Sequence, residues 1–146
     1  MGWKAKCRAL GLEASEGFWN RTEDEIDAIY NGAGPDEFEG WPRWFLRHIF
    51  GDRFADAAGR AMLTVFLGIF EPAFPPHDVE YEDSDHTEES WHEANDRMRR
   101  NMRRLLNLRY PVGKPWLWLH RVRWMIKARA AFLAVESDTG YEAWIS

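Results

Sequence analysis

The sequence predicts an all-α fold, a single-domain bundle of five or six helices. Apolar residues recur at intervals of three and four along most of the chain, and the alternation typical of strands is nearly absent. Clusters of glycine and proline interrupt this pattern, and we expect helices to end there. The 146 residues suit one domain. We expect 1–146 to form that domain, with 1–20 and 136–146 as peripheral arms.

Thr22 and Glu25 predict the start of the first well-defined helix. The Thr22 hydroxyl can accept from the Glu25 amide while the Glu25 carboxylate reaches back, which is a capping box. An apolar side follows, formed by Ile26, Ile29 and Tyr30. The Asn-Gly-Ala-Gly-Pro segment at 31–35 ends this helix, because glycine accepts a left-handed cap and proline cannot continue.

Two further helices are predicted over 41–50 and 54–69. Pro42 suits the first turn of the helix over 41–50, because an N–H at that position would have no helical partner and proline has none to lose. The apolar positions are Trp44, Phe45, Ile49 and Phe50 in the first helix, and Phe54, Ala58, Ala61, Met62, Val65 and Ile69 in the second. Pro72 ends the second helix, and we expect Pro75 and Pro76 to keep the chain extended before His77.

The last two predicted helices flank a break at 111–115. The one before it carries Trp91, Asn95, Met98, Met102, Leu105 and Leu106 on one side. Glutamate is common in its first turns and arginine in its last, the order that the helix dipole favours. The final helix, over 116–135, has an apolar side made of Trp116, Leu119, Val122, Ile126 and Leu133.

Composition and charge exclude several classes of protein. Cys7 is the only cysteine, so no internal disulfide can form, which suits a reducing compartment. No signal peptide and no apolar run long enough for a bilayer are present, and we expect a soluble, cytoplasmic protein. The net charge of −5 is segregated: 71–96 hold ten acidic residues, and 97–129 hold eleven Lys or Arg and no acid. Solvation of opposite faces is the simplest explanation.

Three of the nine tryptophans, Trp116, Trp118 and Trp124, lie among arginines and lysines in the last helix. This mixture occurs in interfacial helices and in nucleic-acid grooves. It also occurs where large rings fill a small core and arginine stems cover them. We favour the core interpretation and do not expect nucleic acid as a partner, because the chain is acidic overall and no nucleic-acid motif matches.

The candidate catalytic residues are His77, Tyr81 and Asp96, and the candidate metal ligand is Asp78. Adjacent side chains on a helix diverge by ~100°, so Asp78 cannot orient the His77 ring. Tyr81 lies one turn further on the same side. Asp96 on the next helix would reach His77 if the two helices pack antiparallel. In that arrangement a carboxylate would hold the imidazole in one tautomer, as a catalytic base requires.

The pattern His77-Asp78-x-x-Tyr81, followed by Asp96, resembles the active-site helices of phospholipase A2 enzymes. The resemblance implies that His77 activates water, that Asp96 orients His77, and that Tyr81 supports their hydrogen bonds. It also implies that Asp78 binds calcium together with carbonyl groups of a glycine-rich loop, for which 30–35 is the candidate. The secreted members depend on several disulfides, whereas this chain has one cysteine.

A second resemblance spans residues 40–110. The segments Trp41–Trp44, His77–Tyr81 and Glu93–Met98 are similar to those of a family of small phage and prophage proteins of unknown function. This resemblance implies an accessory protein whose partner is a phage or host protein. It implies no particular activity.

Three interpretations of function therefore stay open. The chain is a phage or prophage accessory protein in which His77 and Asp78 are mainly structural, or a calcium-assisted hydrolase, or a binding module. The binding module would use the Trp/Arg-rich last helix on a membrane surface or on nucleic acid. The first is favoured, because a histidine–carboxylate pair reflects structure more often than catalysis. The sequence allows either a monomer or a homo-oligomer, and calcium is the one cofactor that it suggests.

Overall fold

The computed structural model describes residues 1–32 and 68–146, and within them it confirms the all-α prediction. The helices are α1 (Trp3–Leu10), α2 (Glu16–Asn20), α3 (Glu23–Gly32), the 3-10 helix η2 (Gly68–Ala73), α6 (Phe74–Glu82), α7 (Glu88–Arg109), the 3-10 helix η3 (Pro115–Leu117), α8 (Trp118–Val135) and α9 (Asp138–Ile145). The helix predicted over 41–50 and residues 54–67 of the helix predicted over 54–69 lie outside the described residues, as does the Trp41–Trp44 motif. Residues 68 and 69, at the end of the second predicted helix, belong to η2.

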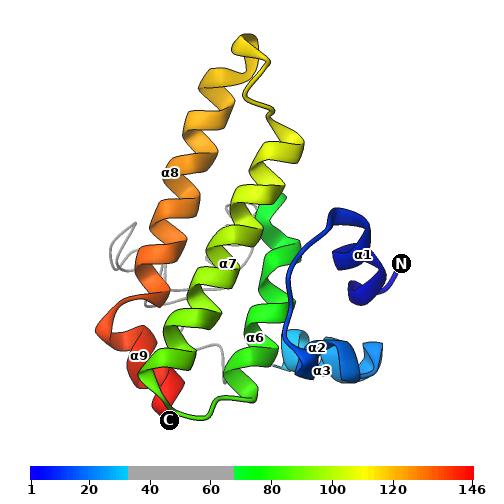
Figure 1. The fold of residues 1–146 in the computed structure, drawn as a ribbon, viewed down its shortest axis with the longest axis vertical. Helices are drawn as coiled ribbons and strands as arrows, with labels where there is room; N and C mark the ends of the chain where they lie inside the picture. The colour runs from blue at the N-terminus through cyan, green and yellow to red at the C-terminus, as the bar shows by residue number, and fades with distance from the viewer. Residues whose placement is uncertain (33–67) are drawn as a thin grey trace.

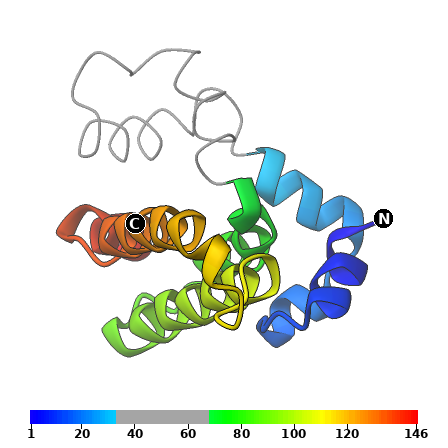
Figure 2. The same cartoon turned by 90° about the horizontal axis from the view of Figure 1, so that it is seen from above.

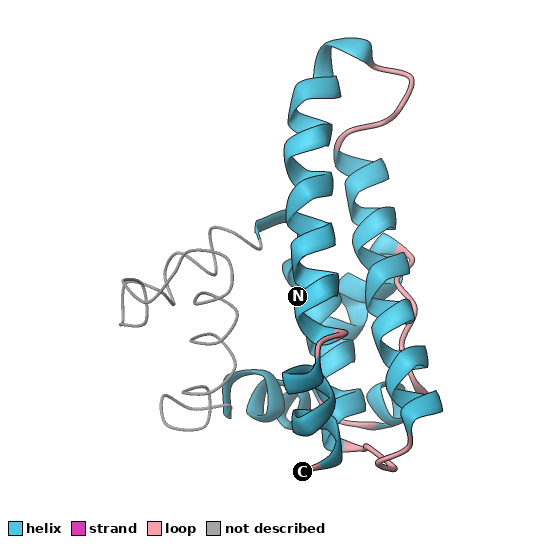
Figure 3. Ribbon diagram, turned by 90° about the vertical axis from the view of Figure 1, so that its left-hand side faces the viewer, coloured by secondary structure: helices cyan, strands magenta, loops and turns pink. Residues whose placement is uncertain are grey.

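A long hairpin of α7 and α8 dominates the described structure (Figure 1). Helix α6 lies along α7, and α1, α2 and α3 lie on the far side of α6 from α8 (Figure 2). The turn between α7 and α8 extends beyond the other described helices, whereas α9 folds back at the opposite end (Figures 1 and 3). The far end of the hairpin is therefore the part that the other described helices leave uncovered.

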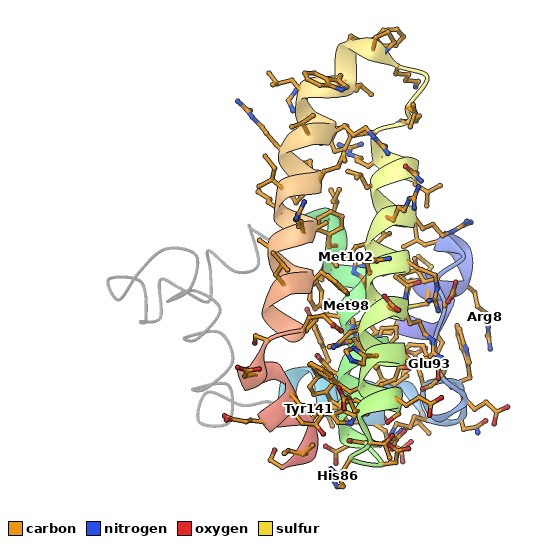
Figure 4. All side chains as sticks on the ribbon, turned by 60° about the vertical axis from the view of Figure 1, so that its left-hand side comes forward. Arg8, His86, Glu93, Met98, Met102 and Tyr141 are labelled. Atoms are coloured by element: carbon orange, nitrogen blue, oxygen red, sulfur yellow. The ribbon has the colours of Figure 1, made fainter. Side chains whose placement is uncertain are left out.

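One hydrophobic core unites the helices from α1 to α8. It contains Cys7, Leu12, Phe18, Ile26, Phe70, Ala73, Phe74, Val79, Met98, Met102, Leu105, Leu106, Ala131 and Val135. Met98 and Met102 lie between α7 and its neighbours, whereas Glu93 points to solvent (Figure 4). Since the side chains of Cys7 and Phe18 are fully buried, the expectation that 1–20 form a peripheral arm is wrong.

The predicted capping box at α3 is confirmed. The Glu25 amide donates to the Thr22 hydroxyl at 3.2 Å, and the Thr22 amide donates to the Glu25 carboxylate at 2.7 Å. At α7 the Thr87 hydroxyl accepts from the Ser90 amide at 3.3 Å. These local bonds satisfy amides that the helices themselves leave unpaired.

The segment before His77 differs from the prediction. Pro75 and Pro76 lie in the first turn of α6 instead of in an extended strand of chain. Proline is tolerated there because the first amides of a helix have no carbonyl to pair with. Both rings are fully buried, so tertiary packing adds to this local tolerance. The result is that His77 begins the second turn of a helix.

Residues 136–146 are also more than a peripheral arm. Helix α9 packs its Trp144 ring into a second cluster with Trp91 and Ala94, flanked by Tyr81 and Tyr141. The Trp144 indole donates to the Thr87 carbonyl at 3.0 Å. Its own carbonyl accepts from the Ser84 hydroxyl at 2.9 Å and from His86 Nδ1 at 3.0 Å. These contacts fasten α9 to the turn between α6 and α7.

We expect Trp144→Ala to lower the free energy of unfolding by roughly 3–5 kcal/mol, because it leaves a cavity and removes an indole hydrogen bond. The adjacent Ile145 is 46% exposed, so Ile145→Ala should cost less than about 1 kcal/mol. Urea unfolding of both variants measures the difference. Similar small losses would mean that α9 is not docked.

Candidate functional site

Helices α6 and α7 pack antiparallel (Figure 1), and His77 of α6 lies against Asn95 of α7. His77 Nε2 and Asn95 Oδ1 are 2.9 Å apart, and both residues are buried, with exposed fractions of 2% and 0%. On one side the His77 ring lies beside Tyr81, which flanks the cluster around Trp91. A hydrogen bond in such surroundings is strong, and breaking it would be costly.

The other end of the Asn95 amide reaches the end of α8. Asn95 Nδ2 donates to the Val135 carbonyl at 3.3 Å and to Glu136 Oε1 at 2.9 Å. Since both donors of the amide point to Val135 and Glu136, its oxygen faces His77 and accepts. His77 therefore carries its proton on Nε2, as the neutral tautomer.

Burial keeps His77 uncharged at neutral pH. Desolvation lowers the pKa of His77 to about 4, and the hydrogen bond to Asn95 opposes that shift only in part. A general base works best with a pKa near the operating pH and with access to the proton it takes. His77 has neither property in this structure, because its side chain is 3% exposed.

The expected pairing of His77 with Asp96 is wrong. The Asp96 carboxylate lies 3.8 Å from Arg99 Nε on the same helix, and its side chain is 52% exposed. Neighbouring positions on a helix point ~100° apart, so Asn95 facing His77 turns Asp96 to solvent. The signal for Asn95 was present in the sequence, since a polar amide on the apolar side of α7 needs buried partners.

Tyr81 does lie beside His77, as its spacing predicts. The two ring centroids are 4.6 Å apart, and the Tyr81 hydroxyl accepts from the Trp91 indole at 3.2 Å. The Tyr81 ring also meets Trp144 edge-on, with centroids 4.8 Å apart. Burial raises the pKa of Tyr81, so its hydroxyl stays protonated. Tyr81 thus links His77 to the aromatic cluster under α9.

Asp78 faces partly outward. Its carboxylate lies 4.0 Å from His77 Nδ1, which is too long for a hydrogen bond, and its side chain is 32% exposed. Desolvation raises the pKa of Asp78 above its ordinary value, and solvent at the exposed third limits that rise.

The described residues do not fit the calcium site that the phospholipase resemblance implies. Among residues 1–32 and 68–146, no three His, Cys, Asp or Glu side chains are grouped to hold a metal ion. Asp78 therefore brings a single carboxylate, whereas calcium takes six to eight oxygen ligands. Residues 33–35 of the glycine-rich candidate loop lie outside the described residues.

Helix α8 forms a second candidate site because it is apolar on two opposite sides. Its inner side packs Trp124 edge-on against Phe70, with centroids 5.4 Å apart, and buries Ala131 and Val135. Its other side carries exposed apolar residues, here called the outer face: Trp118, Leu119, Met125, Ile126 and Leu133. At 100° per residue these five positions fall within about one third of the helix circumference.

The turn that leads into α8 is exposed as well. This hairpin tip, residues 108–119, carries Trp116 at 73% exposed and Val112 at 77% exposed. The expectation that the tryptophan rings of the last helix fill the core is right for Trp124, which packs against Phe70. It is wrong for Trp116 and for Trp118, whose exposed fraction is 64%. In the part of the chain that the structure describes, no helix is long and apolar enough to cross a membrane.

The Lys or Arg residues at the tip or on α8 include Lys114, Arg121, Arg123, Lys127 and Arg129. No acidic residue occurs between Asp96 and Glu136, and this interval holds eleven Lys or Arg. Arg121 is used internally, because it donates to the Tyr110 carbonyl at 2.7 Å and to Asn107 at 2.8 Å. Arg123 and Arg129 are exposed on α8. The site therefore combines an apolar row with positive charge.

Comparison with known proteins found no match among family models, curated proteins or solved structures.

Asn95→Ala should destabilise the fold by roughly 2–5 kcal/mol, because His77 Nε2 and the Val135 carbonyl would each lose a buried partner. The matched change Asp96→Ala, one residue along the same helix, should alter stability by less than about 0.5 kcal/mol. Urea unfolding compares the two. A larger loss for Asp96→Ala would reverse the assignment of the His77 partner.

His77 should also make stability depend on pH. Its pKa is 6.5 in the unfolded chain and about 4 in the folded protein, so the unfolded state binds the proton first as the pH falls. The free energy of unfolding should then drop between pH 6.5 and about 4, by up to ~1.4 kcal/mol per pH unit from this group. Above that window the imidazole is neutral in both states and adds no slope.

The measurement is urea unfolding of the parent and of His77→Gln across that pH range, because carboxylates common to both proteins cancel in the difference. The stability gap between parent and variant should narrow as the pH falls. Parallel profiles would mean that the folded protein does not hold the imidazole neutral.

Proposed function

We propose that this protein is a non-enzymatic docking module that binds another surface through the outer face of α8 and the hairpin tip. The observation that carries the proposal is the row of exposed apolar side chains on the outer face. Several large apolar side chains exposed on one side of a helix are typical of an interaction site.

The packing of α8 supports this proposal. The inner side of the helix supplies its contacts with α7 and η2, through Ala131, Val135 and Trp124. The hairpin can therefore form without the outer face, and residues such as Leu119 and Ile126, at 56% and 65% exposed, contribute little to its stability. Binding to a partner would explain why these exposed positions are apolar.

The surroundings of His77 favour a structural role over a catalytic one. The imidazole is buried, neutral, and bound to the Asn95 amide, and the orienting carboxylate expected from Asp96 is turned away. The calcium-assisted hydrolase is therefore the less supported alternative. The resemblance to phage and prophage proteins stays a prediction, and such a module would suit an accessory protein of that kind.

The double substitution Leu119→Lys with Ile126→Lys tests whether the outer face is free. Because both side chains stand in water, we expect the free energy of unfolding to change by less than about 1 kcal/mol. Binding of an apolar fluorescent dye should fall. The matched inner change Ala131→Lys should cost several kcal/mol, because it buries an ammonium group at a position that is 2% exposed.

A loss of about 4 kcal/mol or more in the double variant, comparable to that of buried aliphatic residues, would overturn the proposal. The outer face would then be covered by the protein itself. Circular dichroism with urea unfolding gives the result without knowledge of the partner.

A further inference from the structure

We propose that the surface on which this module docks is an anionic lipid membrane, with α8 lying along the headgroups. This inference rests on the proposed function and names its partner. Its starting observation is that the hairpin tip and the outer face carry large exposed apolar side chains, and that the cations Lys114, Arg123 and Arg129 are exposed at the tip and on α8.

The apolar part has the dimensions and residue types of an interfacial helix. From Trp116 to Leu133 the row extends over about 25 Å, at 1.5 Å per residue. Leucine, isoleucine and methionine can enter the acyl boundary, and tryptophan prefers the headgroup level because its indole is both apolar and a hydrogen-bond donor. Trp116 and Trp118 lie together at the tip end of this row, at 73% and 64% exposed.

The charges suit an anionic surface and set the orientation. Lys114 at the tip and Arg123 and Arg129 on α8 are exposed, and their flexible stems allow the charged ends to reach phosphates while the helix lies flat. The acidic residues of the hairpin, including Glu88, Glu89 and Glu93, lie at the opposite end of α7 (Figure 1). A negative membrane therefore attracts the tip and α8, and repels the acidic start of α7.

Two other occupants fit the same region less well. Nucleic acid would use the arginines and stack on the tryptophans, but it offers nothing to Leu119, Met125, Ile126 and Leu133, which make up most of the row. A second copy docked face to face would bring two groups of arginines together with no intervening acid, at an electrostatic cost. An anionic lipid surface offers acyl chains to the aliphatic residues and negative headgroups to the arginines.

The experiment is cosedimentation of the full chain with sonicated vesicles, together with its tryptophan emission. Equimolar phosphatidylserine and phosphatidylcholine should bind the protein and shift its emission to the blue, as Trp116 and Trp118 leave water. Vesicles of phosphatidylcholine alone should bind at least about tenfold more weakly, because the charge attraction is lost. Raising the salt concentration should weaken binding to the anionic vesicles.

Two variants separate the contributions to binding. Arg123→Glu removes one positive charge and adds a negative one, and at roughly fivefold per charge it should weaken binding more than about tenfold. Arg8→Glu is the matched control: the same charge change on α1, remote from α8 (Figure 4), should weaken binding less than about twofold. Leu119→Lys with Ile126→Lys should abolish the blue shift, because the apolar row is interrupted even though charge is added.

Failure of the lipid proposal differs from failure of the docking proposal. If the double variant keeps its stability and the parent does not bind anionic vesicles, the lipid inference is wrong and the docking face remains. Salt-sensitive binding to duplex DNA in place of vesicles, or a dimer in size-exclusion chromatography that Ile126→Lys dissociates, would also overturn the lipid inference. Equal effects of Arg123→Glu and Arg8→Glu would show that binding does not involve α8.

Discussion

The Asn95 side chain is the interaction on which the described fold depends most. Its oxygen accepts from His77 on α6, and its nitrogen donates to Val135 and Glu136 at the end of α8. One amide on α7 thus joins three helices, in a setting where an unpaired polar group would cost more than a paired one contributes. The bond to Asn95 also explains why the His77 ring has one orientation and one tautomer, whereas burial keeps the ring uncharged.

The charge segregation along the chain has two physical consequences. Near the middle of α7, opposite charges meet: Arg97 pairs with the buried carboxylate of Glu80 and with Glu93, and Arg100 pairs with Glu13 at 2.7 Å. Further along the hairpin the acids end, and the remaining cations have no neighbouring carboxylate in sequence. The expected solvation of opposite faces is therefore only part of the explanation, because some charges hold helices together.

The buried residues of the bundle and the exposed surface of α8 have different roles in these proposals. His77, Tyr81 and Asn95 are engaged with one another or with buried neighbours, and this favours a structural role for them. Helix α8 has more apolar surface than its contacts with α7 and η2 use. A helix that is apolar on opposite sides has to bury both or to present one to a partner, and this excess is the basis of the docking proposal.

The sequence by itself determined the helical class, the capping box at Thr22 and the buried side of α7, because these depend on local bonds and on the 3.6-residue period. Tertiary structure alone decided which neighbour each side meets. Both sides of α8 are apolar, so periodicity could not tell Trp124 inside from Trp118 outside. Likewise, Asn95 and Asp96 point ~100° apart on α7, and only the packing of α6 against α7 determines that Asn95, and not Asp96, faces His77. Local patterns specify that a surface is apolar or polar, and packing between distant segments specifies what covers it.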